Sequence, residues 1–390
     1  MLNKNADSAA AYFFFAFIAM VGTSYINFLP GVVSALAGGI GFTDVEAGEV
    51  VAFNGYGALL GSIAAIFLVR RIYWKPAMFM FLLLLTMVDT ATVWVSDYSV
   101  MLGWRLLAGL FGGLCMGIAF SVLARLNNPD RAFGALLFIQ FSVGAIVMYL
   151  LPEFEAWLSA YAVFYVMAGF GLLSLTFLFL LPALSQDGKP SQQSLLLAEG
   201  RGNALLLMLA IIFYNCAASA IWAYVEIMGL GAGMDDENVS TYIASTSLLG
   251  LLGAILPMSS GSRFGRFYWV ILGVTLSIFA AAMLSFSPLT PFIYVSAMAL
   301  LFFSWTAVLS YLLAVTAELD TSGRLSTIAS VVALLGSASG PLIAAALLDD
   351  GNFSGMLYAC AIMFLMSILL LFKPVKAQEK EAGIALSAQC

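Results

Sequence analysis

Two charged residues, Asp89 and Arg105, lie inside apolar sequence on either side of one short turn, in "DTATVWVSDYSVMLGWRLLAG" (residues 89–109). The turn centres near Asp97, with Asp89 eight residues before it and Arg105 eight residues after it. In an antiparallel helical hairpin with a rise of about 1.5 Å per residue, both side chains reach a similar depth. Because an unpaired charge in hydrocarbon costs about 2.5–3.5 kcal/mol, we expect Asp89 and Arg105 to pair directly or to share a polar cavity.

Two interpretations of this pair stay open. As a structural clip, it would join two helices and have no part in turnover. As a functional pair, it would mark a transport pathway, as intramembrane ionisable groups usually do. In that case the planar guanidinium of Arg105 suits a carboxylate or phosphate group of a substrate, and Asp89 is a candidate for proton coupling.

Glu226 is another acid within an apolar run, "FYNCAASAIWAYVEIMGLGAG" (residues 213–233). It is either an interfacial glutamate at a helix end or a protonatable carboxylate that couples proton flow to transport. The chain contains no histidine, so a carboxylate would have to carry the proton. Burial disfavours the charged form of a carboxylic acid, which suits this second role.

Several kinds of chemistry are excluded by residue types that the sequence lacks. Without histidine there is no histidine-based catalysis, and a zinc site is not expected. The four cysteines follow neither a disulfide framework nor a metal-binding spacing. No Gly-x-x-x-x-Gly-Lys-Ser/Thr phosphate loop is present, so ATP does not drive the protein directly. We therefore expect no enzyme activity, no cofactor, no metal and no nucleic-acid partner.

The composition is that of an integral membrane protein. Hydrophobic residues make up 63% of the 390 residues and charged residues only 9%, and the mean hydropathy is +1.03. Apolar runs of about 20 residues, the length of a helix that crosses a bilayer, recur along the whole chain. We predict an all-α fold with twelve transmembrane spans: 11–36, 48–69, 76–95, 100–122, 133–151, 158–183, 203–229, 239–258, 267–286, 291–316, 326–347 and 354–373.

The longest hydrophilic connection, residues 184–202, divides the spans into six plus six. We therefore predict an amino-terminal bundle (1–183), a cytoplasmic linker (184–202), a carboxyl-terminal bundle (203–377) and a disordered cytoplasmic tail (378–390). Fourteen of the 15 Lys and Arg residues lie on the side of the membrane that holds both termini, whereas the opposite connections carry acidic stretches such as "EFE" and "MDDEN". This asymmetry predicts cytoplasmic termini, and we expect a monomer in a bacterial inner membrane.

An internal repeat supports this division into halves. A shift of 192 residues superposes five pairs: Gly41 and Gly233, Asp44 and Asp236, Gly61 and Gly253, Arg71 and Arg263, Gly144 and Gly336. Each pair falls at the equivalent place in its half. The chain is therefore expected to contain two homologous, pseudo-symmetric six-helix bundles.

Twelve spans, a central polar loop and two parallel halves resemble the major facilitator superfamily over nearly the whole chain. Members carry a Gly-x-x-x-Asp-Arg-x-Gly-Arg loop between spans 2 and 3, often echoed between spans 8 and 9. Here the echo is Gly261-Ser262-Arg263-Phe264-Gly265-Arg266, whereas the first copy keeps Arg70 and Arg71 but has Val69 in place of the acid. The resemblance implies a gating or conformational role for Arg70, Arg71, Arg263 and Arg266.

Spans 4 and 11 carry further small-residue motifs. Arg105-x-x-x-Gly109 on span 4 is similar to a family motif that is common among proton-coupled members. Span 5 lacks the Gly-Pro-rich motif of many exporters, and Gly336-Ser-Ala-Ser-Gly340-Pro341 lies on span 11 instead. We assign Gly336, Gly340 and Pro341 to the conformational machinery.

The resemblance also implies that spans 1, 4, 7 and 10 line a central cavity. Polar and aromatic residues on these spans are the predicted substrate-binding set: Arg105, Tyr25, Asn27, Tyr214, Asn215, Trp222, Trp305 and Tyr311. For the two asparagines, hydrogen bonding between helices is the competing interpretation.

The predicted function is proton-coupled secondary active transport of a small organic solute by alternating access. The preferred solute is a carboxylate-bearing metabolite that is taken up. One alternative is a proton-coupled exporter of amphipathic drugs or metabolites, in which Asp89 neutralises Arg105 and Glu226 meets the cargo. The other is a membrane sensor that binds a ligand and transports nothing.

Overall fold

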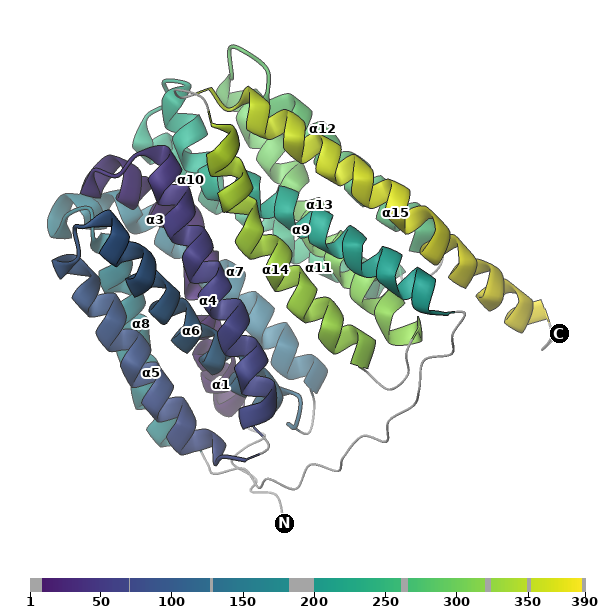
Figure 1. Cartoon of the computed structure of the whole chain (residues 1–390), viewed down its shortest axis with the longest axis horizontal. Coiled ribbons are helices and arrows are strands. Elements are labelled where there is room, and N and C mark those ends of the chain that lie inside the picture. The colour runs from purple at the N-terminus through teal and green to yellow at the C-terminus, as the bar shows by residue number, and fades with distance from the viewer. Residues whose placement is uncertain are drawn as a thin grey trace. The chain divides into compact units, whose positions relative to one another are not determined.

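The computed structural model describes residues 9–69, 71–126, 129–181, 200–260, 266–319, 324–348 and 352–387. Every element assigned in these residues is a helix, which confirms the predicted all-α fold (Figure 1). The earlier helices are α1 (Ala9–Gly22), α2 (Ser24–Asn27), α3 (Leu29–Ser34), the π-helix η1 (Ala35–Ile40), α4 (Asp44–Leu68), α5 (Trp74–Ala91), the 3₁₀ turn η2 (Thr92–Trp94), α6 (Tyr98–Leu123), α7 (Pro129–Leu158) and α8 (Ala162–Leu180). The later helices are α9 (Gly200–Gly231), α10 (Asp236–Ser247), α11 (Leu249–Ser260), α12 (Arg266–Leu284), α13 (Pro291–Leu319), α14 (Arg324–Leu347) and α15 (Ser354–Ser387).

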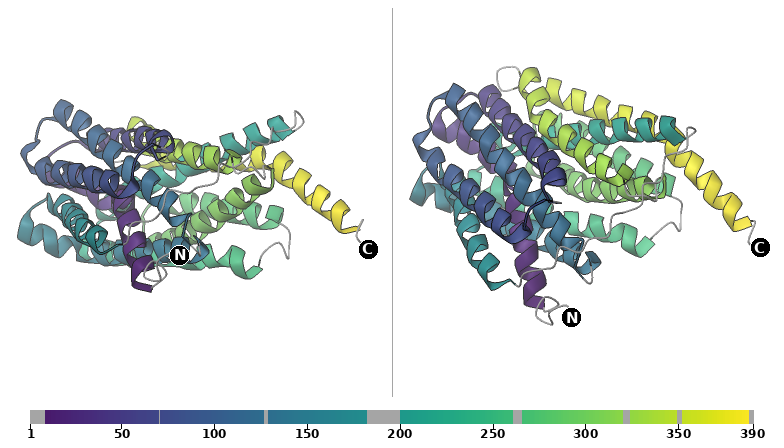
Figure 2. Two further views of the ribbon diagram at one scale, coloured as in Figure 1. Left: turned by 90° about the horizontal axis from the view of Figure 1, so that it is seen from below. Right: turned by 60° about the horizontal axis from the view of Figure 1, so that its bottom comes forward.

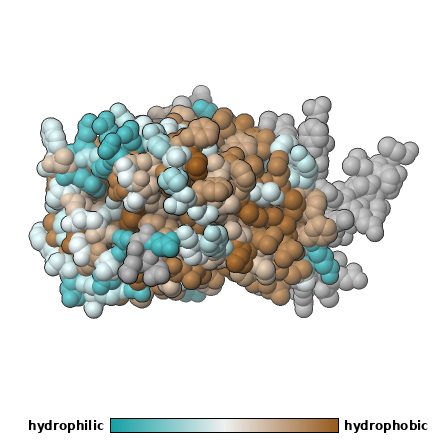
Figure 3. Space-filling model, turned by 90° about the horizontal axis from the view of Figure 1, so that it is seen from above, coloured by the Kyte–Doolittle hydropathy of each residue, from teal (hydrophilic) through white to brown (hydrophobic). Residues whose placement is uncertain are grey.

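Eleven helical segments in the described residues are long and apolar enough to cross a membrane. They match eleven of the twelve predicted spans, with α10 and α11 together forming the eighth. The first predicted span differs, because two shorter apolar helices (10–22 and 29–40) replace one long helix. Exposed apolar side chains such as Phe67, Phe138 and Leu369 cover the outer faces of the helices, and apolar residues occupy much of the surface in Figure 3.

The interruption of the first span lies at Thr23 and Phe28. Their backbone dihedrals, φ −108° and ψ 2° for Thr23 and φ −107° and ψ 20° for Phe28, leave the helical region. The hydroxyls of Thr23 and Ser24 each donate to a backbone carbonyl three residues earlier, at 2.9 Å. Pro30 lies in the first turn of α3 and has no N–H to continue the helical bonding. Local side chains therefore compensate for the break in the helix.

The chain divides into two compact units. The first consists of residues 1–189, 223–230 and 235–244, and the second of residues 190–222, 231–234 and 245–390. The end of α9 and most of α10 thus group with the first unit. Most of the predicted linker falls on residues 182–199, outside the described residues, so the predicted bundle boundaries stay predictions.

Helices α4 and α6 of the first unit approach each other through glycines. A Cβ atom at Gly109 would lie 1.9 Å from the carbonyl oxygen of Asn54, and one at Gly57 would lie 2.1 Å from the carbonyl oxygen of Leu106. Neither position leaves room for a side chain, as is common where membrane helices pack closely. The Asn54 amide also donates to the carbonyl oxygen of Arg105 at 2.9 Å. These contacts hold α6 in register against α4.

The structure supports the internal repeat at individual glycines. Gly41 and Gly233 both have positive φ, at 99° and 82°, and each lies three residues before a helix that begins with an aspartate. Gly61 packs against a backbone carbonyl of α6, and Gly253 packs against one of α13. The pairs Gly41–Gly233 and Gly61–Gly253 therefore share a backbone conformation or a type of helix contact.

The carboxyl-terminal tail differs from its prediction. Residues 378–387 continue helix α15 and are not disordered, as the yellow helix in Figure 2 shows. The sequence of this segment is rich in Ala, Glu, Lys and Gln, which all favour helix. The tail is therefore helical as far as Ser387, in contrast to the expected disorder.

Candidate functional site

Asp89 on α5 and Arg105 on α6 form a buried ion pair. Nη1 of Arg105 lies 3.0 Å from Oδ1 of Asp89. Arg105 is 0% exposed and Asp89 is 3% exposed. Of the two expected arrangements, direct pairing and a shared polar cavity, the structure shows direct pairing, because the α5–α6 hairpin places the two side chains at matching depths.

Thr92 is a second partner of Arg105. Nη2 of Arg105 donates to Oγ1 of Thr92 at 2.5 Å, and that hydroxyl donates to the carbonyl oxygen of Val88 at 2.9 Å. The turn η2 extends α5 and places Thr92 on the same face as Asp89. Sequence reasoning missed Thr92, although its spacing of three residues from Asp89 is the signal of a shared helical face.

Two aromatic rings cover the Arg105 guanidinium. Its carbon lies 4.9 Å from the ring centre of Phe164 on α8 and 5.9 Å from that of Tyr25 in the interrupted span. Both distances are within the range of a cation–π interaction. Phe164 was not predicted, whereas Tyr25 was predicted as a substrate-binding residue. One carboxylate, one hydroxyl and two rings therefore surround the charge of Arg105.

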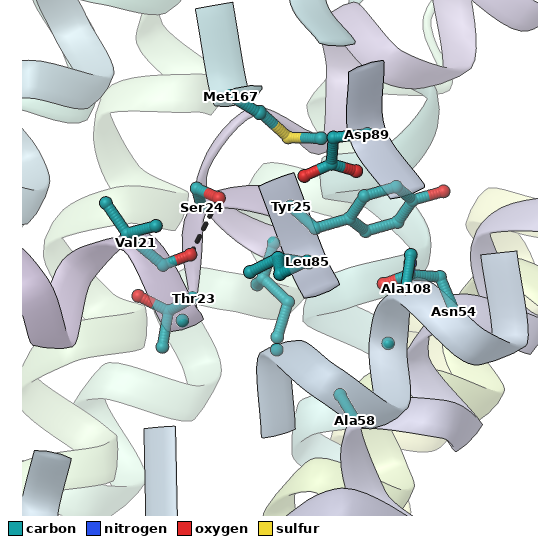
Figure 4. Close-up of a pocket in the computed structure, with 14 residues that line it drawn as sticks. Val21, Thr23, Ser24, Tyr25, Asn54, Ala58, Leu85, Asp89, Ala108 and Met167 are labelled. Atoms are coloured by element: carbon teal, nitrogen blue, oxygen red, sulfur yellow. Dashed lines mark hydrogen bonds between the residues drawn. The ribbon is translucent and has the colours of Figure 1, made fainter. Parts of the chain in front are cut away.

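A small hollow adjoins this cluster. Thr23, Ser24 and Tyr25 of the interrupted span line it together with Asn54 and Asp89, and Figure 4 shows Asp89 and Tyr25 close together there. The Tyr25 hydroxyl is buried without a hydrogen-bond partner. The hollow has room for about one water molecule. It can therefore hold a water beside Asp89 and Tyr25, and it is too small for an organic solute.

Asn27 links the interrupted span to α7. Its Nδ2 donates to the carbonyl oxygen of Gln140 at 3.0 Å. The side chain lies against Gly144, where an added Cβ would be 3.0 Å from the Asn27 amide. Hydrogen bonding between helices, the competing interpretation of Asn27, describes this conformation, and its contact with substrate stays a prediction.

In the second unit, Tyr214 and Asn215 on α9 point into packed surroundings. The Tyr214 hydroxyl is 3.0 Å from Oγ of Ser277, which is 2.8 Å from Oγ of Ser304. This buried chain of hydroxyls joins α9 to α12 and α13. Asn215 donates to the carbonyl oxygen of Ile211 in its own helix at 2.9 Å. Substrate binding by either residue stays a prediction.

The other three aromatic residues of the predicted set, Trp222, Trp305 and Tyr311, lie on α9 and α13. Trp222 is 5% exposed and meets Phe302 edge-on, with ring centres 5.1 Å apart. Tyr311 stacks on Trp269 at 6.5 Å with parallel planes. Trp305 is half-buried. The contact of these three residues with a solute stays a prediction.

Glu226 near the end of α9 belongs to the first unit. It is 3% exposed and interacts with the Ser34 side chain. Its Oε2 atom is buried without a hydrogen-bond partner. Burial to this degree differs from that of an exposed interfacial glutamate, and the part of Glu226 in proton coupling stays a prediction.

The four arginines assigned to gating lie in or beside connections between spans. Arg71 is exposed in the turn between α4 and α5. Arg266 is the first residue of α12. Arg70 and Arg263 lie outside the described residues. Their predicted roles stay untested.

The glycines and proline of α14 lie against α9. A Cβ at Gly336 or Gly340 would be 2.6 Å or 2.4 Å from a carbonyl oxygen of α9. Pro341 lies within α14 and cannot donate to the carbonyl of Ser337, four residues earlier. The Ser219 hydroxyl on α9 donates to that carbonyl instead, at 2.5 Å. Helices α9 and α14 are thus joined at the point where the proline interrupts the α14 backbone bonding.

Comparison with known sequences and structures adds to this geometry. The sequence model of the Major Facilitator Superfamily matches residues 12–319. No curated protein sequence matches the chain.

Three solved structures illustrate the likeness of the fold. The nucleoside transporter NupG is 12% identical, with 93% of this chain and 98% of that chain covered and a TM-score of 0.74. A D-xylose–proton symporter is 14% identical, with coverages of 93% and 97% and a TM-score of 0.75. A bacterial homologue of the human lysosomal transporter Spinster, in an inward-facing and unoccupied conformation, is 14% identical, with coverages of 95% and 96% and a TM-score of 0.64. At these identities the likeness establishes the fold of two six-helix bundles.

Proposed function

Because the chain belongs to the major facilitator superfamily, and is a membrane transporter rather than an enzyme, we propose that protons drive its transport of a small organic solute by alternating access. The preferred solute is a carboxylate-bearing metabolite, taken up together with protons. The observation that carries this proposal is the buried Asp89–Arg105 pair, at 3.0 Å. A buried cation held by a titratable acid can exchange that acid for another anion.

The coupling follows from charge balance at this pair. When Asp89 takes up a proton, the Arg105 guanidinium loses its counter-ion in a dry environment, which costs several kcal/mol. A solute carboxylate restores the balance by accepting hydrogen bonds from the guanidinium. When Asp89 releases its proton to the other side, the ion pair re-forms and the solute is displaced. Proton and solute therefore cross in the same direction.

The solute would be bound in a conformation other than the one described, since the hollow beside Asp89 admits about one water molecule. In alternating access, the bundles rearrange and thereby open the solute site to one side of the membrane at a time. Residues proposed to contact the solute with Arg105 are Tyr25, Asn27, Tyr214, Asn215, Trp222, Trp305 and Tyr311. Residues proposed to support the rearrangement are Arg70, Arg71, Arg263, Arg266, Gly336, Gly340 and Pro341.

A thermal-shift screen followed by an uptake assay tests this proposal. Small carboxylates should raise the melting temperature of the wild type, and the Arg105→Ala variant should lose this effect. In proteoliposomes with an imposed pH gradient, the wild type should accumulate the stabilising carboxylate. The Asp89→Asn variant should lose accumulation by tenfold or more, yet still exchange labelled for unlabelled solute. Unchanged carboxylate affinity in Arg105→Ala contradicts anion recognition by this residue.

Proton-coupled export of amphipathic compounds is the second candidate. Asp89 already neutralises Arg105 in this conformation, and Glu226 is a further buried acid that could meet cationic cargo. Under this alternative, lipophilic cations stabilise the protein, Arg105→Ala only lowers the baseline melting temperature, and expression confers resistance to toxic compounds. A sensor would bind its ligand and move nothing into sealed vesicles.

The chain is a multi-pass membrane protein. We place it in a bacterial inner membrane as a monomer with both termini in the cytoplasm. The asymmetric distribution of Lys and Arg supports this orientation.

A further inference from the structure

Two acids of the first unit bury oxygen atoms that no hydrogen-bond donor reaches. Glu226 on α9 is 3% exposed, and its Oε2 is unpartnered. Glu155 near the end of α7 is half-buried, and its Oε1 is buried and unpartnered. A buried carboxylate oxygen without a donor or cation is costly when charged, and much less costly when the group carries a proton.

The surroundings of Glu226 contain no compensating cation among its described neighbours. From α3, the Ser34 side chain interacts with Glu226. From α7, Glu155 lies close enough to repel Glu226, and from the start of α10 Asp236 repels both glutamates. Asp236 itself is exposed. Two neighbouring carboxyl groups in such a place cannot both ionise without a large penalty.

We infer that Glu155 and Glu226 form a proton-sharing carboxylate pair, which loads a proton from the side of the membrane that bears the acidic connections. Glu155 is then a proton-coupling residue in addition to Asp89 and Glu226. The inference rests on the proposed function in that protons drive transport. It adds a loading site that is distinct from the Asp89–Arg105 pair.

The exposure of the two glutamates suits the entry of a proton. Glu155 is half-buried, whereas Glu226 is 3% exposed. A proton that binds Glu155 from water can therefore pass inward to Glu226. Within the described residues, no cluster of three or more acidic, cysteine or histidine side chains could hold a metal ion. A proton thus matches the pair better than a divalent metal.

The test is thermal unfolding of the purified full-length protein over a range of pH, without any solute. In the wild type, stability should fall as the pH rises, because the folded state must then give up a proton and bury negative charge. Glu226→Gln should remove most of this decline, Glu155→Gln should reduce it, and the double variant should show the least. Glu153→Gln is the matched control, since Glu153 is exposed on the same helix, and it should follow the wild type.

Equal pH dependence in the wild type and in both single variants would overturn the inference. Thermal unfolding in the presence of sodium distinguishes a bound proton from a bound sodium ion. If sodium chloride in place of choline chloride stabilises the wild type but not Glu226→Gln, the occupant is sodium and the proton assignment fails.

A chemical probe replaces the Glu226→Gln variant if that variant does not fold. Dicyclohexylcarbodiimide modifies protonated carboxyl groups. Glu226 should be modified in the wild type and less in Glu155→Gln, and absence of modification overturns the inference.

None of these measurements requires a known solute. Failure of carboxylate uptake would therefore leave the proton-sharing pair intact. Conversely, uptake that depends on Asp89 but not on Glu155 or Glu226 would uphold the proposed transport function and limit proton coupling to the Asp89–Arg105 pair.

Discussion

The guanidinium of Arg105 has five N–H donors, of which one binds Asp89 and another binds Thr92. Such a buried pair adds little net stability compared with apolar packing, but removal of one partner leaves an uncompensated charge. Burial of the pair is therefore tolerated only while the negative charge of Asp89 balances the positive charge of Arg105. Charge balance fits a structural clip without a part in turnover, and it equally fits a proton-controlled anion site. Accumulation by the Asp89→Asn variant distinguishes the two interpretations.

The Asp89→Asn variant measures this balance directly. We expect it to lower the free energy of unfolding by about 3–5 kcal/mol, because the Arg105 charge stays buried without its counter-ion. Asp97→Asn makes the same chemical change at the exposed N-cap of α6, where asparagine caps as well as aspartate, and should be nearly neutral. Equal stability of the two variants in chemical unfolding would show that Arg105 gains another partner or leaves the interior.

The sequence predicted the pair but not its whole surroundings. Asp89 and Arg105 could be found because charge in hydrocarbon is rare and hairpin geometry is regular. Phe164 could not, because it comes from α8 and reaches Arg105 only through tertiary packing. Glu155 belongs to the acidic stretch "EFE", which at the level of the sequence is explained by membrane orientation alone. No local sequence pattern relates it to Glu226.

At the scale of elements, the first span shows how polar side chains permit a break inside a membrane helix. The run 11–36 is apolar throughout most of its length, so hydropathy predicts one helix. The hydroxyls of Thr23 and Ser24 satisfy carbonyls at the break, which removes much of its cost. The interrupted segment then turns Tyr25 toward Arg105 and Asn27 toward α7. A continuous helix would not need these hydroxyls.

The close approach of α4 and α6 makes a second prediction. Gly109→Ala should destabilise the protein by about 1–3 kcal/mol or more, because its Cβ would overlap the α4 backbone. Gly103→Ala lies on the same helix with no atom within 4 Å of its Cβ, and it should be neutral or stabilising by up to about 1 kcal/mol. The two melting temperatures, measured side by side, give the comparison. A tolerated Gly109→Ala would mean that the two helices separate readily.

At the scale of the whole molecule, some predicted features depend on continuous stretches of sequence and others depend on contacts between distant segments. Span number follows from the length of apolar runs, and the repeat follows from a constant offset, so both could be read from the sequence. The shared positive φ of Gly41 and Gly233 supports that offset at the backbone. The end of α9 groups with the first unit because of contacts between distant segments. Hydropathy does not predict such contacts.

Orientation in the membrane is the property on which the direction of proton loading depends. Single cysteines at Glu153 or Asp235 should react with a membrane-impermeant maleimide in intact cells, because these exposed residues flank acidic connections opposite the basic side. Cysteines at Arg71 or Arg125, also exposed, should react only after permeabilisation. Cys115, Cys216 and Cys360 are buried and contribute little background once Cys390 is replaced by serine. The reverse pattern would place the Glu155–Glu226 pair on the cytoplasmic side, where a proton is released during uptake rather than loaded.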